Sequence, residues 1–360
     1  MRSIPGSAND RQVAVTQSNQ LAEENSGSGK SGRWRALIFA MIGIIALLTG
    51  LSLFGDAREI RAALRDFDWR LLPVILGLTL WNYAWRFVKW NRFLRALEIP
   101  EIPGLLNLGV YLSGYSMSIT PGKVGELVKA IYIRRINGTP VNRTSAAIAA
   151  ERITDAIAML LLALVGLLEF NYGRPLVGIA AFVTLAGIIA IQKPSWLHAL
   201  LDWLTRYSRL ESPIVHARAF VDASNVLYRP RILMKAVGIG IVSWAGECVA
   251  FYFVLVGLGI DASWDLLLTA TFILAVSSLA GGASMVPGGL GVTDASVAGM
   301  LMLLVDDPSM TRAVAAAATL IIRFATLWFA VLIGAIALPM VERRIRRLSA
   351  TATAPITGND

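Results

Sequence analysis

Long apolar segments constrain this sequence more than any other feature. Blocks of about 18 or more residues with few charges recur along the chain, and a helix of about that length crosses the hydrocarbon core of a bilayer. The mean hydropathy of +0.61 and the hydrophobic content of 56% are too high for a soluble fold of 360 residues to bury. The sequence therefore predicts an all-α polytopic membrane protein.

We predict about six full transmembrane helices from these blocks. They are expected over residues 36–54, 71–90, 153–170, 175–191, 233–258 and 312–340. Basic residues flank the blocks, including Lys89, Arg92 and Arg95 near the end of the second block. Cytoplasmic loops are enriched in Lys and Arg, so this pattern predicts a multi-pass protein of the cell (cytoplasmic or inner) membrane with both termini cytoplasmic.

The blocks also predict the organisation of the chain. Residues 1–35 are polar and too poor in apolar residues to form a core, which indicates a disordered cytoplasmic N-terminal tail. Residues 36–342 form the predicted transmembrane domain, and residues 343–360 a basic cytoplasmic C-terminal tail. Within the domain, residues 193–231 carry basic side chains and leucines at helical spacing, which favours a cytoplasmic helix lying on the membrane surface.

Charge and composition exclude several kinds of ligand. The net charge of +9 comes from basic residues beside the apolar blocks, and no soluble module remains to bind nucleic acid. The single cysteine, Cys248, excludes an intramolecular disulfide. The two histidines, His198 and His216, lie in a polar connecting segment. We expect no metal and no cofactor.

Two stretches, residues 104–132 and 265–305, are not simple spans. Each has an apolar run, a Pro-Gly break and a second apolar run, which is typical of a broken or re-entrant helical hairpin. Unwound backbone at membrane depth is tolerated only where protein or a water-filled cavity satisfies its hydrogen bonds. The breaks therefore indicate the position of a site.

The two breaks share the pattern S-x-x-P-G-x-x-G followed by an acid. The first runs from Ser118 to Glu126 and the second from Ser284 to Asp294. Basic residues flank the first and acidic residues flank the second, so the two hairpins would enter the membrane from opposite faces. This predicts an inverted repeat with a substrate site near the midplane. The alternative is that Pro and Gly simply kink two ordinary helices.

The first break favours an anionic headgroup as the ligand. A helix starting near Pro121, with Thr120 as its cap, would direct free N–H groups and the positive end of its dipole toward the cavity. The candidate substrate-binding residues around this break are Thr120, Pro121, Gly122, Lys123, Gly125, Glu126, Lys129, Arg134 and Arg135. Those at the second break are Pro287, Gly288, Gly289, Gly291 and Asp294. Two alternatives stay open: that Glu126 and Asp294 only complement helix dipoles, and that Arg134 and Arg135 only set topology.

Further charged residues fall inside the predicted spans, where each is costly unless paired or hydrated. Glu151 and Asp155 lie four residues apart on one helix face, with Arg152 between them. Arg86, Glu247 and Arg323 lie deeper, and Glu247 could pair with either arginine. We add Glu151, Arg152, Asp155 and Arg323 to the candidate substrate-binding residues.

Three motifs resemble those of a known family. TPGKVGELVKA at 120–130, ERITD at 151–155 and VPGGLGVTDAS at 286–296 are similar to motifs of the lysylphosphatidylglycerol synthase transmembrane-region family, also described as flippase-like integral membrane proteins. The resemblance covers about residues 36–345. It implies a membrane domain that in multidomain relatives is joined to a soluble aminoacyl-transferase domain. Only a short basic tail follows the last span here, so we expect no synthase activity. The family commonly has Glu where this chain has Asp294.

The leading hypothesis is a flippase-like carrier that translocates an anionic or polyprenyl-linked envelope lipid between leaflets. One alternative is a membrane-embedded lipid-headgroup transferase with Glu126, Glu151 or Asp155 as general base. Another is an accessory subunit of an envelope lipid or glycan synthesis complex. The expected partners are an anionic phospholipid or a polyprenyl-linked lipid, and a second copy of the chain or an envelope-synthesis enzyme.

Overall fold

The computed structural model describes residues 57–167 and 220–352, without the side chains of residues 121–123 and 349–352. These residues belong to one compact unit, Ala46–Asp360. Within the described ranges every regular element is helical, and no strand occurs. The predicted tail 1–35, the spans 36–54 and 175–191 and most of segment 193–231 lie outside the described residues.

Five described helical segments are long and apolar enough to cross a membrane. They are Trp69–Ala96, Pro230–Gly257, Trp264–Ala283, Pro287–Leu304 and Arg312–Leu348. This confirms the prediction of an all-α polytopic membrane protein. The helix α6 (Val141–Leu167) is outside this set, because its apolar half carries Glu151, Arg152 and Asp155.

Three helices extend beyond the predicted spans. Helix α3 (Leu72–Ala96) continues past residue 90, and α6 begins at Val141, well before residue 153. Helix α14 (Phe329–Ala352) runs through the predicted boundary at residue 342. Each extension contains Arg together with Glu, Asn, Ser or Thr, which lower the hydropathy of a predicted span although helices accommodate them. Hydropathy alone therefore placed the ends of these helices too early or too late.

The longest helix-helix interface joins α3 to α10 (Pro230–Gly257), and the two helices are antiparallel. The backbone N–H of Asp68 donates to the carbonyl of Gly257 over 2.9 Å. Farther along, Asn82 Nδ2 donates to the Ser243 carbonyl and Ser243 Oγ donates to the Asn82 carbonyl, each over 3.1 Å. Hydrogen bonds between helices stabilise packing in a membrane, where apolar contact alone does not distinguish protein from lipid.

The first broken hairpin consists of short pieces. Helix α4 (Gly104–Ser113) leads into the 3₁₀ turns η2 (Gly114–Met117) and η3 (Pro121–Leu127), and α5 (Val128–Asn137) follows. At 1.5 Å per residue, the ten residues of α4 span about 15 Å, roughly half of a hydrocarbon core. A left-handed glycine, Gly138, ends α5.

The second broken hairpin has a longer first arm. Helix α11 (Trp264–Ala283) is followed by the short turn η6 (Pro287–Gly289) and by α12 (Val292–Leu304), which packs back against α11. The twenty residues of α11 span about 30 Å, so this arm can cross the core by itself. Cα atoms of η3 and η6 approach within 8 Å, so the two Pro-Gly breaks meet.

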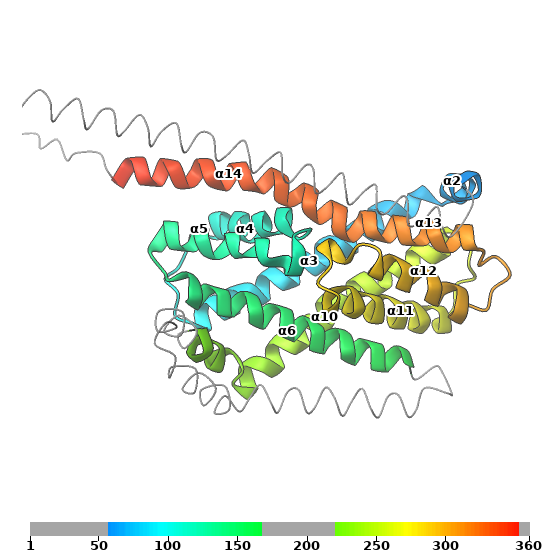
Figure 1. Cartoon of the computed structure of the whole chain (residues 1–360), viewed down its shortest axis with the longest axis horizontal. Coiled ribbons are helices and arrows are strands. Elements are labelled where there is room, and N and C mark those ends of the chain that lie inside the picture. Colours follow the sequence, from blue (N-terminus) through cyan, green and yellow to red (C-terminus); the bar gives the residue numbers. More distant parts are fainter. Residues whose placement is uncertain (1–56, 168–219, 353–360) are drawn as a thin grey trace, which may run out of the picture. The chain divides into compact units, whose positions relative to one another are not determined.

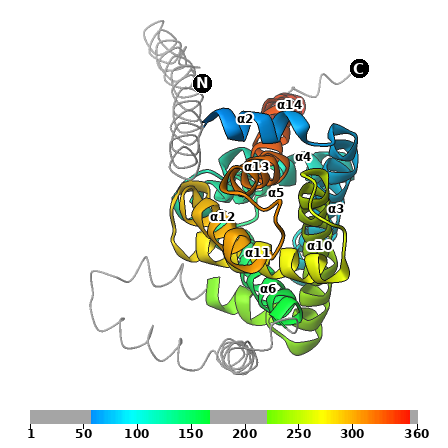
Figure 2. The ribbon, with the colours of Figure 1, turned by 90° about the vertical axis from the view of Figure 1, so that its right-hand side faces the viewer.

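A single long helix closes the described fold, as Figure 1 shows in orange to red. It consists of α13 (Arg312–Arg323), a π-helical turn (η7, Phe324–Trp328) and α14. Its first part packs against α12 and against the short helix α2 (Ala57–Asp66), which crosses it in Figure 2, whereas α14 packs against α4 and η2.

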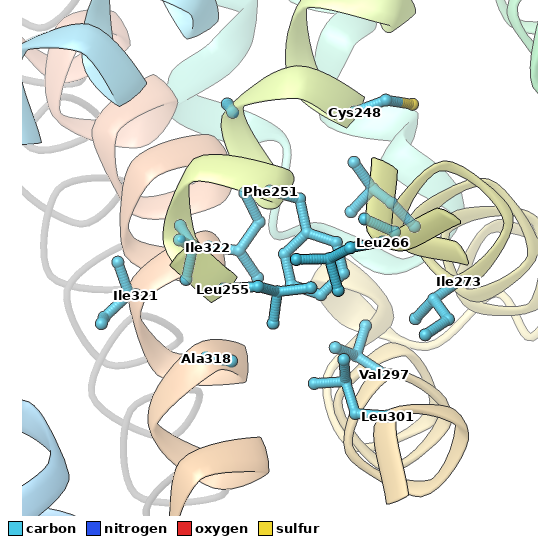
Figure 3. Packing of buried hydrophobic residues seen from close by; sticks show 14 of the residues in the cluster. Cys248, Phe251, Leu255, Leu266, Ile273, Val297, Leu301, Ala318, Ile321 and Ile322 are labelled. Carbon is cyan, nitrogen blue, oxygen red and sulfur yellow. The ribbon is translucent and has the colours of Figure 1, made fainter. Parts of the chain in front are cut away.

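Two apolar cores flank the middle of the fold. In the first, side chains of α10, α11, α12 and α13 interdigitate, with Phe251, Leu255, Ile273 and Leu301 pointing toward one another (Figure 3). The second core gathers α3, α4, α5 and α6. Along α6, Ala146 to Ala150 belong to the second core and Met159 to Ala163 to the first. The charged residues between these stretches therefore lie where the two cores adjoin.

Candidate functional site

Seven charged side chains from four helical elements meet where the cores adjoin, and we call them the central cluster. They are Arg86 and Lys89 of α3, Glu126 of η3, Lys129 of α5, and Glu151, Arg152 and Asp155 of α6. All are buried except Arg152, whose side chain is 27% exposed. Four of the seven are basic, so the cluster carries one excess positive charge.

Glu151 is the hub of the central cluster. Arg86 Nη2 lies 3.0 Å from its Oε1, and Lys129 Nζ lies 3.1 Å from its Oε2. The hydroxyl of Tyr111 donates to Oε1 over 2.8 Å, and Tyr115 donates to Tyr111 over 3.0 Å. A carboxylate with no exposed surface is tolerated here because charged and neutral donors surround it.

The other two carboxylates extend this network in opposite directions. Asp155 Oδ2 lies 3.2 Å from Arg86 Nη2, and its Oδ1 pairs with Lys89. Glu126 accepts from Arg152 Nη2 over 2.6 Å and lies 3.5 Å from Lys129 Nζ. Glu151 and Asp155 share one helix face, as predicted, and Arg86 binds them both.

Aromatic rings cover the cations of the cluster. Lys129 Nζ lies 4.8 Å from the ring centre of Trp90 and 5.0 Å from that of Tyr111. The guanidinium carbon of Arg86 lies 5.7 Å from the ring centre of Tyr115. Cation-π contacts of this kind stabilise a positive charge that has lost its water.

A second, smaller charged group ties the last long helix to the second break. Arg323 Nε lies 2.7 Å from Asp294 Oδ1, and Arg323 Nη2 donates to the carbonyl of Gly288 over 2.7 Å. The other carboxylate oxygen of Asp294 accepts from the backbone N–H of Gly291 over 2.8 Å. The π-helical turn begins directly after Arg323, and the hydroxyl of Tyr83 donates to the carbonyl of Thr326 in that turn. Such π turns occur frequently at functional sites.

The backbone of the second break takes conformations that few residues adopt. Gly288, Gly289 and Gly291 have positive φ angles, as glycine allows. Met285 also has φ 54°, which is uncommon for a residue with a side chain. A Cβ atom added to Gly281 would lie 1.9 Å from Thr293 Oγ1, so the two arms of this hairpin pack in close contact.

The helix predicted to start near Pro121 does start there, with Thr120 as its N-cap, but it is a 3₁₀ helix rather than an α-helix. Residues Pro121–Leu127 form a 3₁₀ segment, and the α-helix begins only at Val128. The hydroxyl of Thr120 accepts from Gly125 N–H over 2.8 Å and donates to the Met117 carbonyl over 2.7 Å, so it caps the loop. The positive end of the α5 dipole therefore lies nearer Lys129 than Pro121.

A cavity of about 490 Å³ lies between the two breaks, in the size range of small-molecule sites. Its wall includes Ser118 and Glu126 from the first break, and Met285, Gly288 and Gly289 from the second. The basic residues on its wall are Arg86, Arg152 and Arg323, and the acidic ones are Glu126, Asp155 and Glu247.

Two of the three cavity arginines keep a donor that the described residues do not use. The Nε–H groups of Arg86 and Arg152 have no hydrogen-bond acceptor there, whereas Arg323 Nε lies 2.7 Å from Asp294 Oδ1. An unsatisfied buried donor is rare in a folded protein. The guanidinium groups of three arginines on one cavity wall fit a ligand that brings acceptor oxygens.

Of the eighteen candidate residues, the structure brings nine to the cavity or into ion pairs with its wall, and it separates two. Glu126, Arg152, Asp155, Gly288, Gly289 and Arg323 line the cavity, and Lys129, Glu151 and Asp294 pair with residues of its wall. Arg134 and Arg135 instead lie exposed at the end of α5, where Arg135 Nη1 is 3.4 Å from Glu342 of α14. Their place agrees with the topological alternative.

Sequence reasoning missed part of the site. Lys89 was taken only as a topology signal, although it is fully buried, and Tyr111, Tyr115 and Trp244 were not singled out. The three-residue spacing of Arg86 and Lys89 on one helix was the available signal for Lys89. In the described ranges, no group of three or more His, Cys, Asp or Glu could hold a metal ion.

The fold and the site define an integral membrane protein of helices with a charged cavity between two helix breaks. The chain belongs to the lysylphosphatidylglycerol synthase transmembrane-region family, whose model matches residues 37–334.

Curated relatives agree with this membership. A UPF0104 membrane protein of Methanothermobacter thermautotrophicus is 24% identical over 85% of this chain and 95% of its own length. A second UPF0104 membrane protein of that organism is 22% identical over 83% of this chain and 91% of its own length. The glycosyltransferase AglD of Haloferax volcanii is 22% identical over 71% of this chain, but the match covers only 47% of AglD.

Proposed function

We propose that this protein is a flippase-like carrier that moves an anionic or polyprenyl-linked lipid between the leaflets of the cell membrane. In this proposal the cavity between the breaks holds the lipid headgroup. The observation that carries it is the set of three arginines on the cavity wall. Phosphate oxygens are the acceptors that arginine binds best.

The charge balance of the cavity wall favours exchange over permanent capture. Three arginines and three carboxylates line it. A headgroup phosphate would compete with Glu126 for Arg152, the most exposed cation of the central cluster. Because the arginine has a partner in both the loaded and the empty state, the ligand can leave as well as bind.

Contact between the breaks supports the inverted-repeat hypothesis as part of this proposal. The two hairpins carry the same Pro-Gly pattern, and η3 and η6 pack together beside the cavity. Relative movement of the hairpins would expose the cavity to one leaflet and then to the other. We further propose that the basic ends of α3, α5 and α14 face the cytoplasm.

The geometry gives less support to the transferase alternative. Each carboxylate of the central cluster already binds two cationic side chains, so its oxygen atoms are committed to ion pairs. A general base needs a lone pair free to accept a proton. The relative named as a glycosyltransferase keeps open a role beside envelope-synthesis enzymes, which stoichiometric co-purification of such an enzyme would support.

A vesicle assay tests the proposal directly. Purified full-length protein is reconstituted with fluorescent phosphatidylglycerol, fluorescent phosphatidylcholine or a labelled polyprenyl phosphate, and loss of signal to an impermeant quencher reports movement between leaflets. We expect faster exchange of at least one phosphate-bearing lipid than in protein-free vesicles. Arg152→Gln should abolish that exchange, and the exposed Arg134→Gln should retain it. Equal rates with and without protein for all three lipids would refute the carrier function.

A further inference from the structure

A second hollow, distinct from the central cavity, lies between α3 and α10. It measures about 400 Å³, and we call it the α3–α10 groove. Its described wall includes three basic residues, Lys89, Arg92 and Lys235, and no acidic one. The rest of the wall is apolar and includes Phe93 and Ile239.

Two of the three cations have no protein partner in the part of the chain that the structure describes. Arg92 and Lys235 are exposed, and no described carboxylate lies within 4.0 Å of either. Antiparallel packing brings them together, because the C-terminal part of α3 lies beside the N-terminal part of α10. Among the described residues, the groove therefore combines unpaired positive charge with an apolar wall.

Lys89 connects the α3–α10 groove to the central cavity. Lys89 belongs to the wall of the groove, and its ammonium group pairs with Asp155, which lines the cavity. A Cβ atom on Gly240 would lie 2.9 Å from the Cβ of Ala158. The absence of a side chain at Gly240 thus lets α10 pack closely against α6 beside Lys89.

We propose that the α3–α10 groove binds the phosphate group of an anionic membrane lipid, at a site separate from the central cavity. Arg92 and Lys235 would bind the phosphate oxygens, and the apolar wall would contact the adjoining part of the lipid. Basic pockets between transmembrane helices favour such headgroups, because a charge-assisted contact forms beside hydrocarbon.

Lipid titration of the full-length protein in detergent, followed by native mass spectrometry, tests this site. The probes are phosphatidylglycerol, zwitterionic phosphatidylcholine, and inorganic phosphate as competitor. The double variant Arg92→Gln/Lys235→Gln should weaken phosphatidylglycerol binding about tenfold, since it removes two charge-assisted contacts. The matched control, Arg95→Gln/Arg231→Gln, removes two exposed charges on the same helices that do not line the groove, and should change affinity less than twofold.

The competitor separates the two sources of phosphate. Displacement of phosphatidylglycerol by millimolar inorganic phosphate would assign the groove to the free anion. Persistence of phosphatidylglycerol binding would assign the groove to the lipid. Both results support a phosphate site. Unchanged binding in the double variant, equal loss in the control, or equal affinity for phosphatidylcholine would overturn it. Arg152→Gln alters the central cavity but not the groove, so retained binding in that variant tests this site independently of the carrier function.

Discussion

Arg323 donates a hydrogen bond to the backbone carbonyl of Gly288 over 2.7 Å, across 35 positions of sequence. The same side chain pairs with Asp294, so one arginine fixes both the Pro-Gly turn and the first turn of the helix after it. The second break is therefore held by a side chain of the last long helix.

Replacing Arg323 should destabilise the protein strongly. In Arg323→Met, Asp294 would remain buried without its cation, which typically costs about 3–5 kcal/mol. We expect a clear fall in the thermal unfolding temperature in detergent. The control Arg312→Met changes an exposed arginine at the start of α13 and should leave that temperature within a few degrees. Similar unfolding temperatures for the two variants would contradict the structural role of the pair.

The Lys89–Asp155 ion pair predicts how strongly three sets of substitutions will lower the free energy of unfolding, relative to one another. Asp155→Asn leaves the fully buried Lys89 without a carboxylate and should cost about 3–5 kcal/mol of unfolding free energy. Lys89→Met should cost less, because Asp155 keeps Arg86. The double variant Lys89→Met/Asp155→Leu should recover part of the loss. Reversible unfolding of the three variants in mixed micelles checks this order, and a more damaging Lys89→Met would contradict it.

Gly125 is predicted to tolerate no side chain. A Cβ atom there would lie 2.4 Å from the Cβ of Met117 and 2.8 Å from Thr120 Oγ1, so Gly125→Ala forces the capped loop apart. Overpacking of this kind costs about 1–3 kcal/mol. Gly299 of α12 has open space around its Cβ position, so Gly299→Ala is the matched control and should be neutral or stabilising. Thermal unfolding of both variants, together with the vesicle exchange rate, distinguishes the two sites.

The loop after α12 should loosen in acid. The backbone N–H of Ser309 donates to Asp307 over 2.7 Å and, with the weaker contact from Asp261 N–H, lowers the pKa of Asp307 below its usual range. A lowered folded-state pKa means that this stabilisation is present above about pH 4 and is lost as pH falls through the folded-state value. Hydrogen exchange of the Ser309 amide, corrected for intrinsic rate, should show protection at pH 6 that declines toward pH 3. Asp307→Ala should remove this pH dependence, and a variant that kept it would refute the assignment.

Several features of the fold and site were predictable because composition determines them. Apolar blocks indicate membrane spans wherever they occur, and a Pro-Gly pair in such a block requires an explanation. Glu151 and Asp155 were recognisable from helical spacing alone. These signals are local, so a single sequence contains them.

The partners of these residues were not predictable, because they come from distant elements. Lys89 looked like the basic end of a span, but α3 continues to Ala96 and places Lys89 two turns inside the helix. Arg134 and Arg135 lie at the opposite end of α5 from Glu126, and their distance from the cavity follows from the α-helix starting only at Val128. The pairing of Arg323 with Asp294 depends on how α13 packs against α12, which hydropathy does not report.

The π-helical turn after Arg323 lets the last long helix contact two different parts of the fold. A π turn holds about one residue more than an α turn, and each residue of an α-helix turns the next side chain by about 100°. Side chains after Trp328 thus point in directions that an uninterrupted helix would not give them. The part before the turn can pack against α12 while the part after it packs against α4 and η2. A single inserted residue therefore lets one helix serve as a wall for both halves of the molecule.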